Sequence, residues 1–529
     1  MLSFLLLFIA GSVTAVIKVN TTTKMFQDDY GRSVIFHGVN VVVKSAPYIP
    51  ITTSFDPQMS LCPQDIQNLA NWGFNFVRLG VMWQAVETSP GVYNTTYLQL
   101  INNLVNQLGA AGLYTLVDAH QDVFARRICG EGVPDFYAQN LSDTCGELSP
   151  VLEGFGACTP MSKFNFTYDA NGDPLISDCL THMFADYYAT PQAMDAFNRL
   201  YKNINGLQDK FLAYWNVVSQ YFVNNNYVVG YDPINEPLAA DMYTEPTYAV
   251  PGVFDKEGLQ PLYQKVNNVV RKYDSNKILF FEPVQSDLLP ILGGIVFNAG
   301  FNETPGGPSL NYAQVLNDHL YCCDMENEKC TANGGDPPAS TKLLCERFHD
   351  QKVKLRREDA NNLGIGLMIT EFGACSNRSD CPIEINSVTN ACDKYLTGWS
   401  YWMFKGFGDY TTTGNLEEGL YDGDGNLQTM KLKALERTYV PYYQGVPTKI
   451  YFIDTTGYFS TTFELSPNVS APTVLFLNAA LVYPNGYTLT VSNTLDLKPQ
   501  ITSKGNFINI LFTNPAASTT TIIITPKAK

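Results

Sequence analysis

Residues 227–237 read YVVGYDPINEP, and this stretch decides the fold. An apolar run ends at a proline, and then Asn235, Glu236 and Pro237 follow. Because proline interrupts both helices and central strands, the run predicts a short buried strand that stops where the polar residues begin. Taken alone, the stretch fits an ordinary turn after a strand as well as it fits the acid of an active site.

Seven other runs of the same kind occur along the chain. They are mostly continuous in hydrophobicity, which is typical of strands buried on both faces of a parallel sheet. The eight predicted strands are 33–43, 74–81, 113–120, 227–236, 277–284, 315–321, 365–373 and 398–405. Helical patterns separate them, at 63–73, 95–112, 194–204, 211–222, 260–274, 343–359 and 429–439. This alternation predicts an α/β fold, a (β/α)8 TIM barrel.

The sequence divides into three predicted parts. Residues 1–15 combine a short apolar run with small residues, as in a secretory signal peptide. Residues 16–442 form the barrel, with a cysteine-containing insertion at about 121–193 after the third strand. From residue 443 to 529 the helical patterns vanish, and short alternating β-branched runs predict a small C-terminal β-sandwich.

Composition narrows the classes of function and the compartment. A formal net charge of −16 argues against a nucleic-acid partner, which requires a basic surface. Twelve cysteines and seven N-x-S/T sequons suit a disulfide-bonded glycoprotein, secreted or delivered to a lumen such as the lysosome. No run after the signal peptide is long and apolar enough to predict a transmembrane segment. The oligomeric state is not predicted.

Polar and aromatic residues recur where the predicted strands end, which is where barrels of this kind place their chemistry. Two of them, Glu236 and Glu371, follow the fourth and seventh strands, which face each other across a barrel mouth. Two opposed carboxyl groups can cleave a glycosidic bond: one donates a proton to the leaving oxygen, and the other attacks the anomeric carbon or activates water. The remaining candidates are Lys44, Arg78, Asp118, His120, Asn235, His319, Tyr321 and Trp402.

Each of these residues alone also has a structural explanation. A single glutamate at a strand end is more often an ion-pair partner, and a single histidine is more often a hydrogen-bonded core residue. None of the five histidines has the spacing of a metal motif such as H-E-x-x-H, so we expect neither a catalytic metal nor a cofactor. The coincidence of many such residues at one end favours a glycosidase over a non-catalytic barrel that binds lipid or carbohydrate.

Three motifs resemble glycoside hydrolase family 5: INEP at 234–237, DHLY at 318–321 and TEFG at 370–373. Two further stretches resemble the endoglycoceramidases within that family, VVVKSAP at 41–47 and VDAHQDVF at 117–124. The appended β-sandwich agrees with this resemblance. Those enzymes hydrolyse the bond between the glucose of a glycosphingolipid and its ceramide, with retention, and release the oligosaccharide intact.

The resemblance implies roles for the strand-end residues. Glu236 would be the acid/base and Glu371 the nucleophile of a double displacement. Asn235 would hydrogen-bond the 2-hydroxyl of the substrate, and Tyr321 would orient the nucleophile. By the same resemblance, Lys44, Asp118, His120 and Trp402 would bind the glucose next to the scissile bond, with Arg78 and His319 in support.

The expected partner is a glycosphingolipid, a ganglioside or neutral glycolipid, at a membrane or micelle surface. Its ceramide needs an apolar groove, for which 81–83, 292–297 and 403–407 are candidates, although each also fits barrel packing. Two alternatives share the two glutamates: a secreted β-glucanase or mannanase of the same family, and a glucosylceramidase.

The insertion departs from the family pattern. An aromatic residue that would bind sugar there has no clear counterpart, and its candidates are Phe184, Tyr187 and Tyr188.

Overall fold

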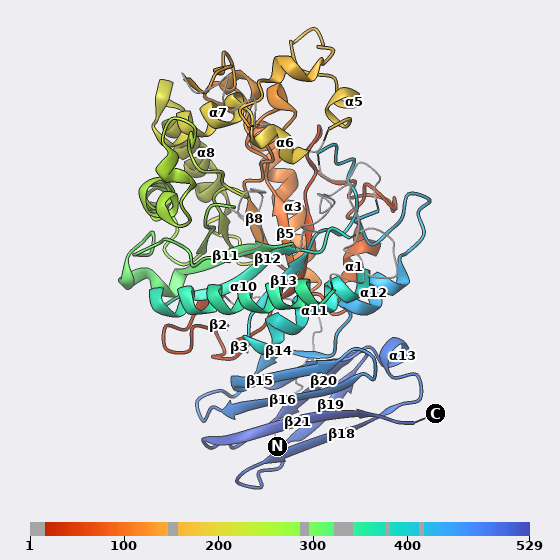
Figure 1. Ribbon diagram of the computed structural model, residues 1–529. Helices are drawn as coiled ribbons and strands as arrows, with labels where there is room; N and C mark the ends of the chain where they lie inside the picture. Colours follow the sequence, from red (N-terminus) through yellow and green to blue (C-terminus); the bar gives the residue numbers. More distant parts are fainter. Residues whose placement is uncertain are drawn as a thin grey trace.

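The computed structural model contains a closed barrel of eight parallel strands and, at one end of it, a domain of antiparallel strands (Figure 1). The predicted signal peptide lies outside the described residues. Among the described helices, none is long and apolar enough to cross a membrane. The structure describes residues 16–146, 157–182, 184–285, 296–321, 342–375, 381–411 and 417–528.

Each of the eight predicted runs contains one barrel strand, so the predicted barrel is confirmed. Every residue of these strands is buried, because side chains on one face fill the barrel and those on the other pack against helices. The strands are β4 (His37–Val41), β5 (Phe76–Gly80), β8 (Tyr114–Asp118), β9 (Val228–Asp232), β10 (Ile278–Phe281), β11 (Gln314–Leu320), β12 (Gly366–Phe372) and β13 (Gly398–Tyr401).

Seven helices occupy the predicted positions, with ends displaced by a few residues. They are α1 (Pro63–Asn71), α3 (Thr95–Ala110), α7 (Pro191–Tyr201), α8 (Leu207–Phe222), α9 (Gln260–Val270), α10 (Lys342–Leu363) and α12 (Thr429–Leu435). The predicted helix 429–439 is wrong at its end, because β14 (Tyr439–Tyr443) begins there. A further helix, α11 (Cys381–Lys394), escaped prediction because its β-branched and short polar residues favour helix weakly.

The antiparallel domain consists of two sheets and draws strands from both ends of the chain. One sheet contains β15 (Gly445–Ile453), β16 (Tyr458–Leu465), β21 (Ser518–Pro526) and β18 (Tyr487–Asn493). The other contains, in order, β1 (Lys18–Val19), β2 (Phe26–Gln27), β3 (Ser33–Val34), β14, β17 (Thr473–Phe476), β20 (Phe507–Leu511) and β19 (Gln500–Lys504). The second sheet therefore crosses the predicted boundary at residue 443, and the exact domain division stays a prediction.

A stack of three rings joins the barrel to this domain. His37, at the start of β4, lies between Trp399 of β13 and Tyr439 of β14, with ring centroids 4.2 and 3.6 Å away. All three side chains are buried. The amino ends of the barrel strands therefore rest on the antiparallel domain through aromatic packing.

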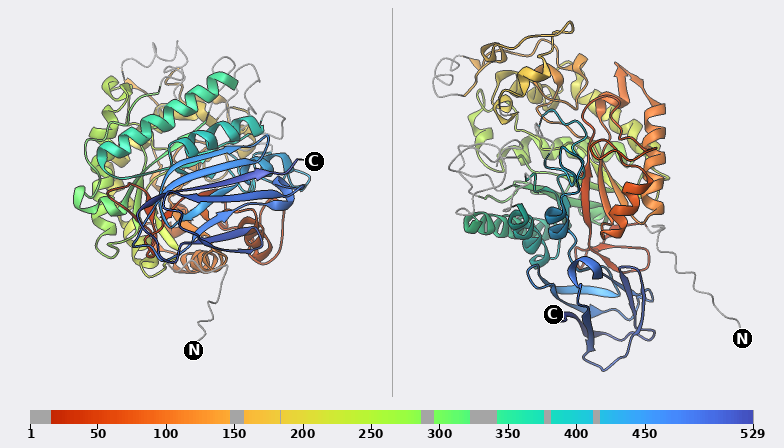
Figure 2. Two further views of the ribbon diagram at one scale, coloured as in Figure 1. Left: turned by 90° about the horizontal axis from the view of Figure 1, so that it is seen from below. Right: turned by 90° about the vertical axis from the view of Figure 1, so that its right-hand side faces the viewer.

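The insertion after β8 covers the other end of the barrel, away from the antiparallel domain (Figures 1 and 2). Its helices include α5 (Ile176–Cys179) and α6 (Phe184–Tyr188). Two disulfides, Cys129–Cys179 and Cys145–Cys158, join its loops. Because β8 enters the insertion at its carboxyl end, the insertion lies over the end of the barrel where active sites are built.

The expectation of disulfides is confirmed for most cysteines of the described chain, although two buried thiols are free. Cys375 pairs with Cys381, and Cys345 is also disulfide-bonded. Cys62 and Cys392 are the free thiols. The adjacent Cys322 and Cys323 lie outside the described residues.

Candidate active site

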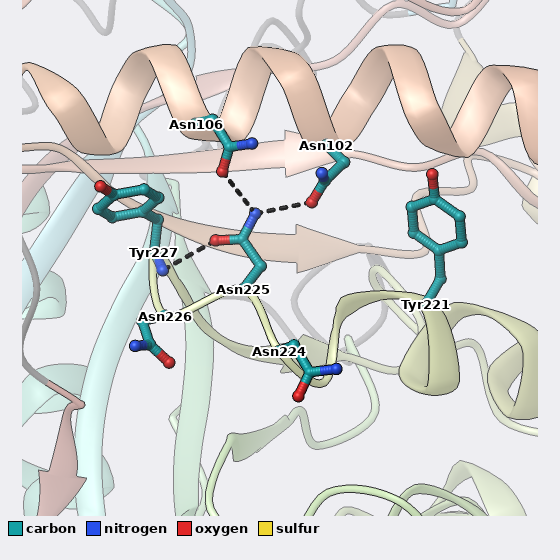
Figure 3. A pocket seen from close by; sticks show the side chains of 7 residues that line it. All are labelled: Asn102, Asn106, Tyr221, Asn224, Asn225, Asn226 and Tyr227. Carbon is teal, nitrogen blue, oxygen red and sulfur yellow. Dashed lines mark hydrogen bonds between the residues drawn. The ribbon is translucent and has the colours of Figure 1, made fainter.

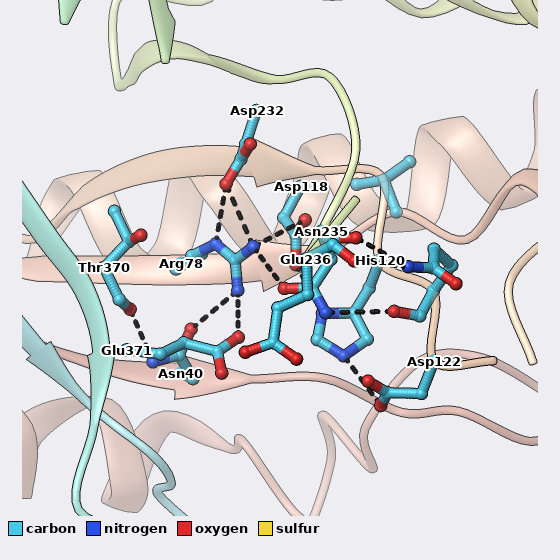
Figure 4. Close-up of polar contacts among 12 residues, drawn as sticks. Asn40, Arg78, Asp118, His120, Asp122, Asp232, Asn235, Glu236, Thr370 and Glu371 are labelled. Atoms are coloured by element: carbon cyan, nitrogen blue, oxygen red, sulfur yellow. Dashed lines mark hydrogen bonds and ion pairs between the residues drawn. The ribbon is translucent and has the colours of Figure 1, made fainter. Parts of the chain in front are cut away.

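Arg78 of β5 lies at the centre of the predicted site and contacts several of its residues (Figure 4). Its Nη1 donates to Glu371 (2.5 Å), and its Nη2 donates to Asp118 (3.0 Å) and Asn235 (2.9 Å). Its Nε donates to Asp232, 3.0 Å away. The guanidinium is fully buried, so these contacts leave it one orientation and join β5 to the ends of three other strands, β8, β9 and β12.

Glu371, at the end of β12, is surrounded by donors. Besides Arg78, the hydroxyl of Tyr321 donates to its Oε2 (3.0 Å), and Nδ1 of His319 lies 3.4 Å away. Burial raises the pKa of Glu371, and the charge of Glu236 adds to this, while His319 and Arg78 oppose it. The donors therefore favour the ionised carboxylate that a nucleophile requires.

Glu236 lies beside Glu371 and is bound through its own Oε1. Nδ1 of His319 is 2.8 Å from this oxygen, and Nε2 of Gln285 donates to it at 3.3 Å. An oxygen of Glu236 and an oxygen of Glu371 lie within 4.8 Å of each other. This proximity is compatible with the roughly 5–5.5 Å that separates the two carboxyl groups of retaining glycosidases.

A second cluster surrounds the ammonium of Lys44. Nζ of Lys44 lies 2.5 Å from Asp122, 2.9 Å from Asp409 and 3.4 Å from Glu131, and it donates to Thr411 at 2.8 Å. Burial alone would lower the pKa of Lys44, but the three carboxylates raise it well above its usual value. The side chain is therefore a charged donor throughout the physiological pH range.

His120 and Trp402 connect the two clusters. Nδ1 of His120 lies 2.9 Å from Asp118 and Nε2 lies 3.3 Å from Asp122. Burial alone would lower the pKa of His120, but these two carboxylates raise it to about 10. Its ring stacks on Trp402, with centroids 5.2 Å apart, and Nζ of Lys44 lies 5.0 Å from the same indole. Charged donors beside an aromatic face suit the binding of a sugar ring.

The structure thus connects all ten predicted residues in one set of contacts, while their individual roles stay predictions. The candidate set left out several polar residues that these contacts include. Asp122 stands two residues after His120, and Asp232 and Glu282 lie within predicted strands, so a signal existed for these three; Glu282 was interpreted as a structural or supporting residue. The residues left out include Asp122, Glu131, Asp232, Glu282, Gln285 and Asp409.

Of the three aromatic candidates in the insertion, Tyr188 is the one on which the charges of site carboxylates act. It is buried, which raises its pKa well above the usual value, and the charges of Asp122 and Glu236 add to this. Tyr187 is also buried, but its hydroxyl donates to the carbonyl of Cys179 (2.6 Å) and so stabilises the insertion.

Among the described residues, two groups of side chains have the spacing of metal ligands: His120 with Asp122 and Glu131, and Glu236 with His319 and Glu371. In each group a protein cation already neutralises the carboxylates. Lys44 does so in the first, and Arg78 does so in the second. The expected absence of a metal stays a prediction.

The predicted groove segments 81–83 and 403–407 are wrong as groove walls, because their apolar side chains are buried in the barrel core. Residues 292–295 lie outside the described residues, but Phe297 is 37% exposed. It lines a hollow beyond the carboxyl ends of β9 and β10. The apolar lining of this hollow includes Met242, Tyr248, Val250, Val284 and Phe297.

A different hollow, of about 370 Å³, lies beside the amino end of β9 (Figure 3). Its lining has five asparagines and two tyrosines and no carboxylate, histidine, lysine or arginine. Nδ2 of Asn225 donates to Asn102 (2.7 Å) and to Asn106 (3.0 Å), which ties α3 to the loop before β9. The acid and base needed for glycoside cleavage are therefore found at the other end of the barrel.

Comparison with known proteins agrees with this geometry. Residues 47–151 and 181–408 match the cellulase (glycosyl hydrolase family 5) model, and 437–525 match the glycoside hydrolase family 5 C-terminal domain. The endoglycoceramidase of Cyanea nozakii is 31% identical over 90% of this chain and 87% of its own length. The endoglycoceramidase of Hydra vulgaris is 31% identical over 94% of this chain and 87% of its own length.

Solved structures of endo-glycoceramidase II from Rhodococcus sp. share the fold, with a TM-score of 0.70 at 20% identity over 95% of this chain and 99% of theirs. One of them is a ganglioside GM3 complex and another is a lactosyl-enzyme intermediate. The chain belongs to the endoglycoceramidases of glycoside hydrolase family 5.

Proposed function

We propose that this protein hydrolyses the β-glucosidic bond between the oligosaccharide and the ceramide of glycosphingolipids and releases both parts intact. The observation that carries the proposal is the pair Glu236 and Glu371, buried at the barrel mouth with oxygens within 4.8 Å. Their spacing supports a retaining double displacement. The ganglioside complex and the trapped lactosyl intermediate of a structural relative support the same chemistry.

In the first step, a carboxylate oxygen of Glu371 attacks the anomeric carbon of the glucose. The bond from that carbon to the ceramide oxygen breaks, and Glu236 gives this oxygen its proton, so ceramide leaves as a neutral alcohol. Arg78 and Tyr321 hold Glu371 through the contacts at 2.5 and 3.0 Å, which fixes the direction of attack.

In the second step, Glu236 acts as the base. It takes a proton from water, the water oxygen attacks the anomeric carbon, and the ester bond to Glu371 breaks. Two inversions give net retention, and both glutamates return to their starting states. No cofactor enters either step.

The Lys44 cluster, His120 and Trp402 would bind the glucose, with Asn235 on its 2-hydroxyl. Nη2 of Arg78 donates to Oδ1 of Asn235, which leaves the amide N–H groups of that side chain to act as donors. One of them reaches the carbonyl of Gln121, at 2.9 Å. Tyr188 supplies the aromatic surface that the insertion was expected to contribute.

The ceramide would leave on the Glu236 side, toward the hollow beyond β9 and β10, whose lining combines apolar side chains with Asp255, Asn298 and Arg356. Val284, in its lining, is next to Gln285, which contacts Glu236 directly. Val250 and Phe297 are 53% and 37% exposed, so the hollow opens at the surface. This placement would let the enzyme take its substrate from a micelle or membrane surface without a spanning helix.

The protein would reach its substrate by secretion or by delivery to a lumen such as the lysosome. The disulfides within the insertion support an oxidising compartment. Four sequon asparagines, Asn140, Asn165, Asn302 and Asn468, are exposed, as attachment of a glycan requires.

The direct test is hydrolysis of a ganglioside and lactosylceramide in detergent micelles, with both products measured by mass spectrometry. The proposal expects intact oligosaccharide and ceramide in equal amounts. Cellulose and mannan oligomers are the controls for a polysaccharide hydrolase, and glucosylceramide is the control for a glucosylceramidase. Cleavage of the polysaccharides alone, or of glucosylceramide but not lactosylceramide, would contradict the proposal.

A further inference from the structure

The backbone at Glu236 has an unusual conformation. Its φ is +39°, in the left-handed region that residues with a side chain rarely occupy. Such a conformation costs free energy and persists only where its surroundings hold it, which happens most often at functional sites. The groups that hold this turn therefore help to set the position of the carboxyl group itself.

Two buried side chains from other strand ends hold the turn. Oε2 of Glu282, which follows β10, accepts a hydrogen bond from the backbone N–H of Glu236 at 3.0 Å. Nε2 of Gln121 donates to the carbonyls of Asn235 (2.7 Å) and Glu236 (3.2 Å). Among the described residues, Glu282 is the carboxylate that accepts from this N–H, so it is the group whose loss would free the peptide.

The second oxygen of Glu282 faces the imidazole that contacts the acid/base. Oε1 of Glu282 lies 3.3 Å from Nε2 of His319, and Asn317 donates to the same oxygen at 3.2 Å. The other nitrogen of His319 lies 2.8 Å from Oε1 of Glu236. Glu282 therefore reaches Glu236 by two routes, through its peptide N–H and through His319.

We propose that Glu282 is a positioning residue for the acid/base: it holds the backbone of Glu236 in the left-handed turn and keeps His319 charged against the carboxyl group. The inference rests on the proposed role of Glu236. Glu282 itself touches neither the sugar nor the leaving oxygen in the proposed reaction. It acts on the step in which the ceramide oxygen receives its proton.

The charge state of His319 supports the second route. Burial alone would lower the pKa of His319, but Glu282, followed by Glu371, outweighs burial and raises it well above its usual value. Both ring nitrogens then carry a proton and can face carboxylates on either side. Loss of the charge of Glu282 would lower this pKa and weaken the contact with Glu236.

The test exploits the fact that proton donation matters only for poor leaving groups. We would measure kcat/KM, which reports on steps up to departure of the leaving group, for lactosylceramide and for 2,4-dinitrophenyl β-lactoside. Glu282→Ala should lose about 100-fold on lactosylceramide but less than about threefold on the dinitrophenyl substrate, because general acid catalysis contributes on that scale.

Glu282→Gln keeps an acceptor for the peptide N–H but removes the charge beside His319. We expect a loss of about tenfold on lactosylceramide and, as for Glu282→Ala, a much smaller loss on the dinitrophenyl substrate. This near-isosteric variant also keeps the test open if Glu282→Ala does not fold.

Glu87→Gln is the matched control. Glu87 is a fully buried carboxylate that accepts from Trp83 Nε1, Gly91 N and Tyr137 Oη, each at 2.7 Å, and these contacts involve neither Glu236 nor His319. We expect a lower Tm and an unchanged ratio of the two kcat/KM values.

Glu236→Gln distinguishes failure of the inference about Glu282 from failure of the acid/base assignment of Glu236. If it shows the leaving-group dependence while both Glu282 variants lose equally on the two substrates, the inference about Glu282 is wrong and the acid/base assignment stands. If Glu236→Gln itself loses equally on both, the acid/base assignment fails, and the inference fails with it.

Discussion

The two ends of the barrel differ in the kinds of side chain that they bury. At the carboxyl ends, the side chains of Arg78, Lys44 and His319 are buried among carboxylates. At the amino ends, His37 is buried between two aromatic rings, and burial followed by the charge of Arg437 lowers its pKa, so it stays neutral. The carboxyl ends therefore surround buried charged groups, and the amino ends surround packed aromatic rings.

This difference separates function from stability along single strands. Buried ion pairs contribute little net stability, since the cost of removing the charges from water offsets their attraction. Stacked aromatic rings stabilise a fold without that cost. We therefore expect substitutions at the carboxyl ends to affect turnover first, and substitutions at the amino ends to affect unfolding first.

The largest expected effect comes from Glu371→Gln. The change keeps the shape of the side chain but removes the nucleophile, so kcat on lactosylceramide should fall by about 10³-fold or more. Thermal unfolding should give a Tm close to that of the unchanged protein, because the substitution removes one buried negative charge from a group of closely spaced charged side chains. A variant that keeps more than a tenth of its activity would remove Glu371 from the chemistry.

Arg78→Lys should have the next largest effect. Lysine keeps the charge but cannot reproduce the planar fork that binds four partners, so we expect a loss of about 100-fold in kcat/KM and of about 3 kcal/mol in the free energy of unfolding. Burial raises the pKa of Glu371 and Arg78 opposes that rise; the shorter lysine keeps the charge but loses the direct contact with this carboxylate, so its pKa should rise further. The acidic limb of the kcat/KM profile should then move to higher pH; a limb that stays in place would contradict this electrostatic role.

Tyr188→Phe should have a smaller effect. It keeps the ring and removes the hydroxyl near Asp122 and Glu236. KM for lactosylceramide should rise about three- to tenfold with little change in kcat, because the lost contact is with bound sugar in both ground and transition states. Tyr187→Phe, the neighbouring tyrosine bound to Cys179, serves as the control and should leave KM unchanged.

The smallest effect on activity is expected at the amino end, from His37→Phe. The pKa of His37 is lowered in the folded protein, so below about pH 6.5 the unfolded chain binds a proton that the folded protein does not. Acidification therefore destabilises the protein, by up to about 2 kcal/mol between pH 7 and pH 5 from this group. Denaturant unfolding should show that His37→Phe loses less free energy of unfolding between pH 7 and pH 5 than the unchanged protein does. Its kcat/KM at pH 7 should stay within twofold of the value for the unchanged protein.

The barrel was predictable because burial on both faces leaves a clear signal in short apolar runs. The strands β1 and β2 were not, since two residues carry no periodicity, and the single predicted strand 33–43 divides into β3 and β4, which belong to different sheets. Helix α11 was hidden by its own weak helix propensity.

The residues of the site likewise differ in whether the sequence indicated them. Glu236 and Glu371 stand in motifs at strand ends, so their sequence positions indicated them. Glu131 and Asp409 come from irregular loops, and only the folded chain shows that both reach the ammonium of Lys44. Glu282 was visible at a strand end, but its hydrogen bond to a strained peptide depends on geometry that no sequence pattern carries.

The most direct test of the account is to trap the covalent intermediate with a 2-deoxy-2-fluoro β-lactoside that carries an activated leaving group. Intact mass spectrometry and peptide mapping would then locate the sugar. The account predicts one glycosyl group per chain, bound as an ester to Glu371. A sugar bound to Glu236, or a product of inverted configuration with no adduct, would contradict it.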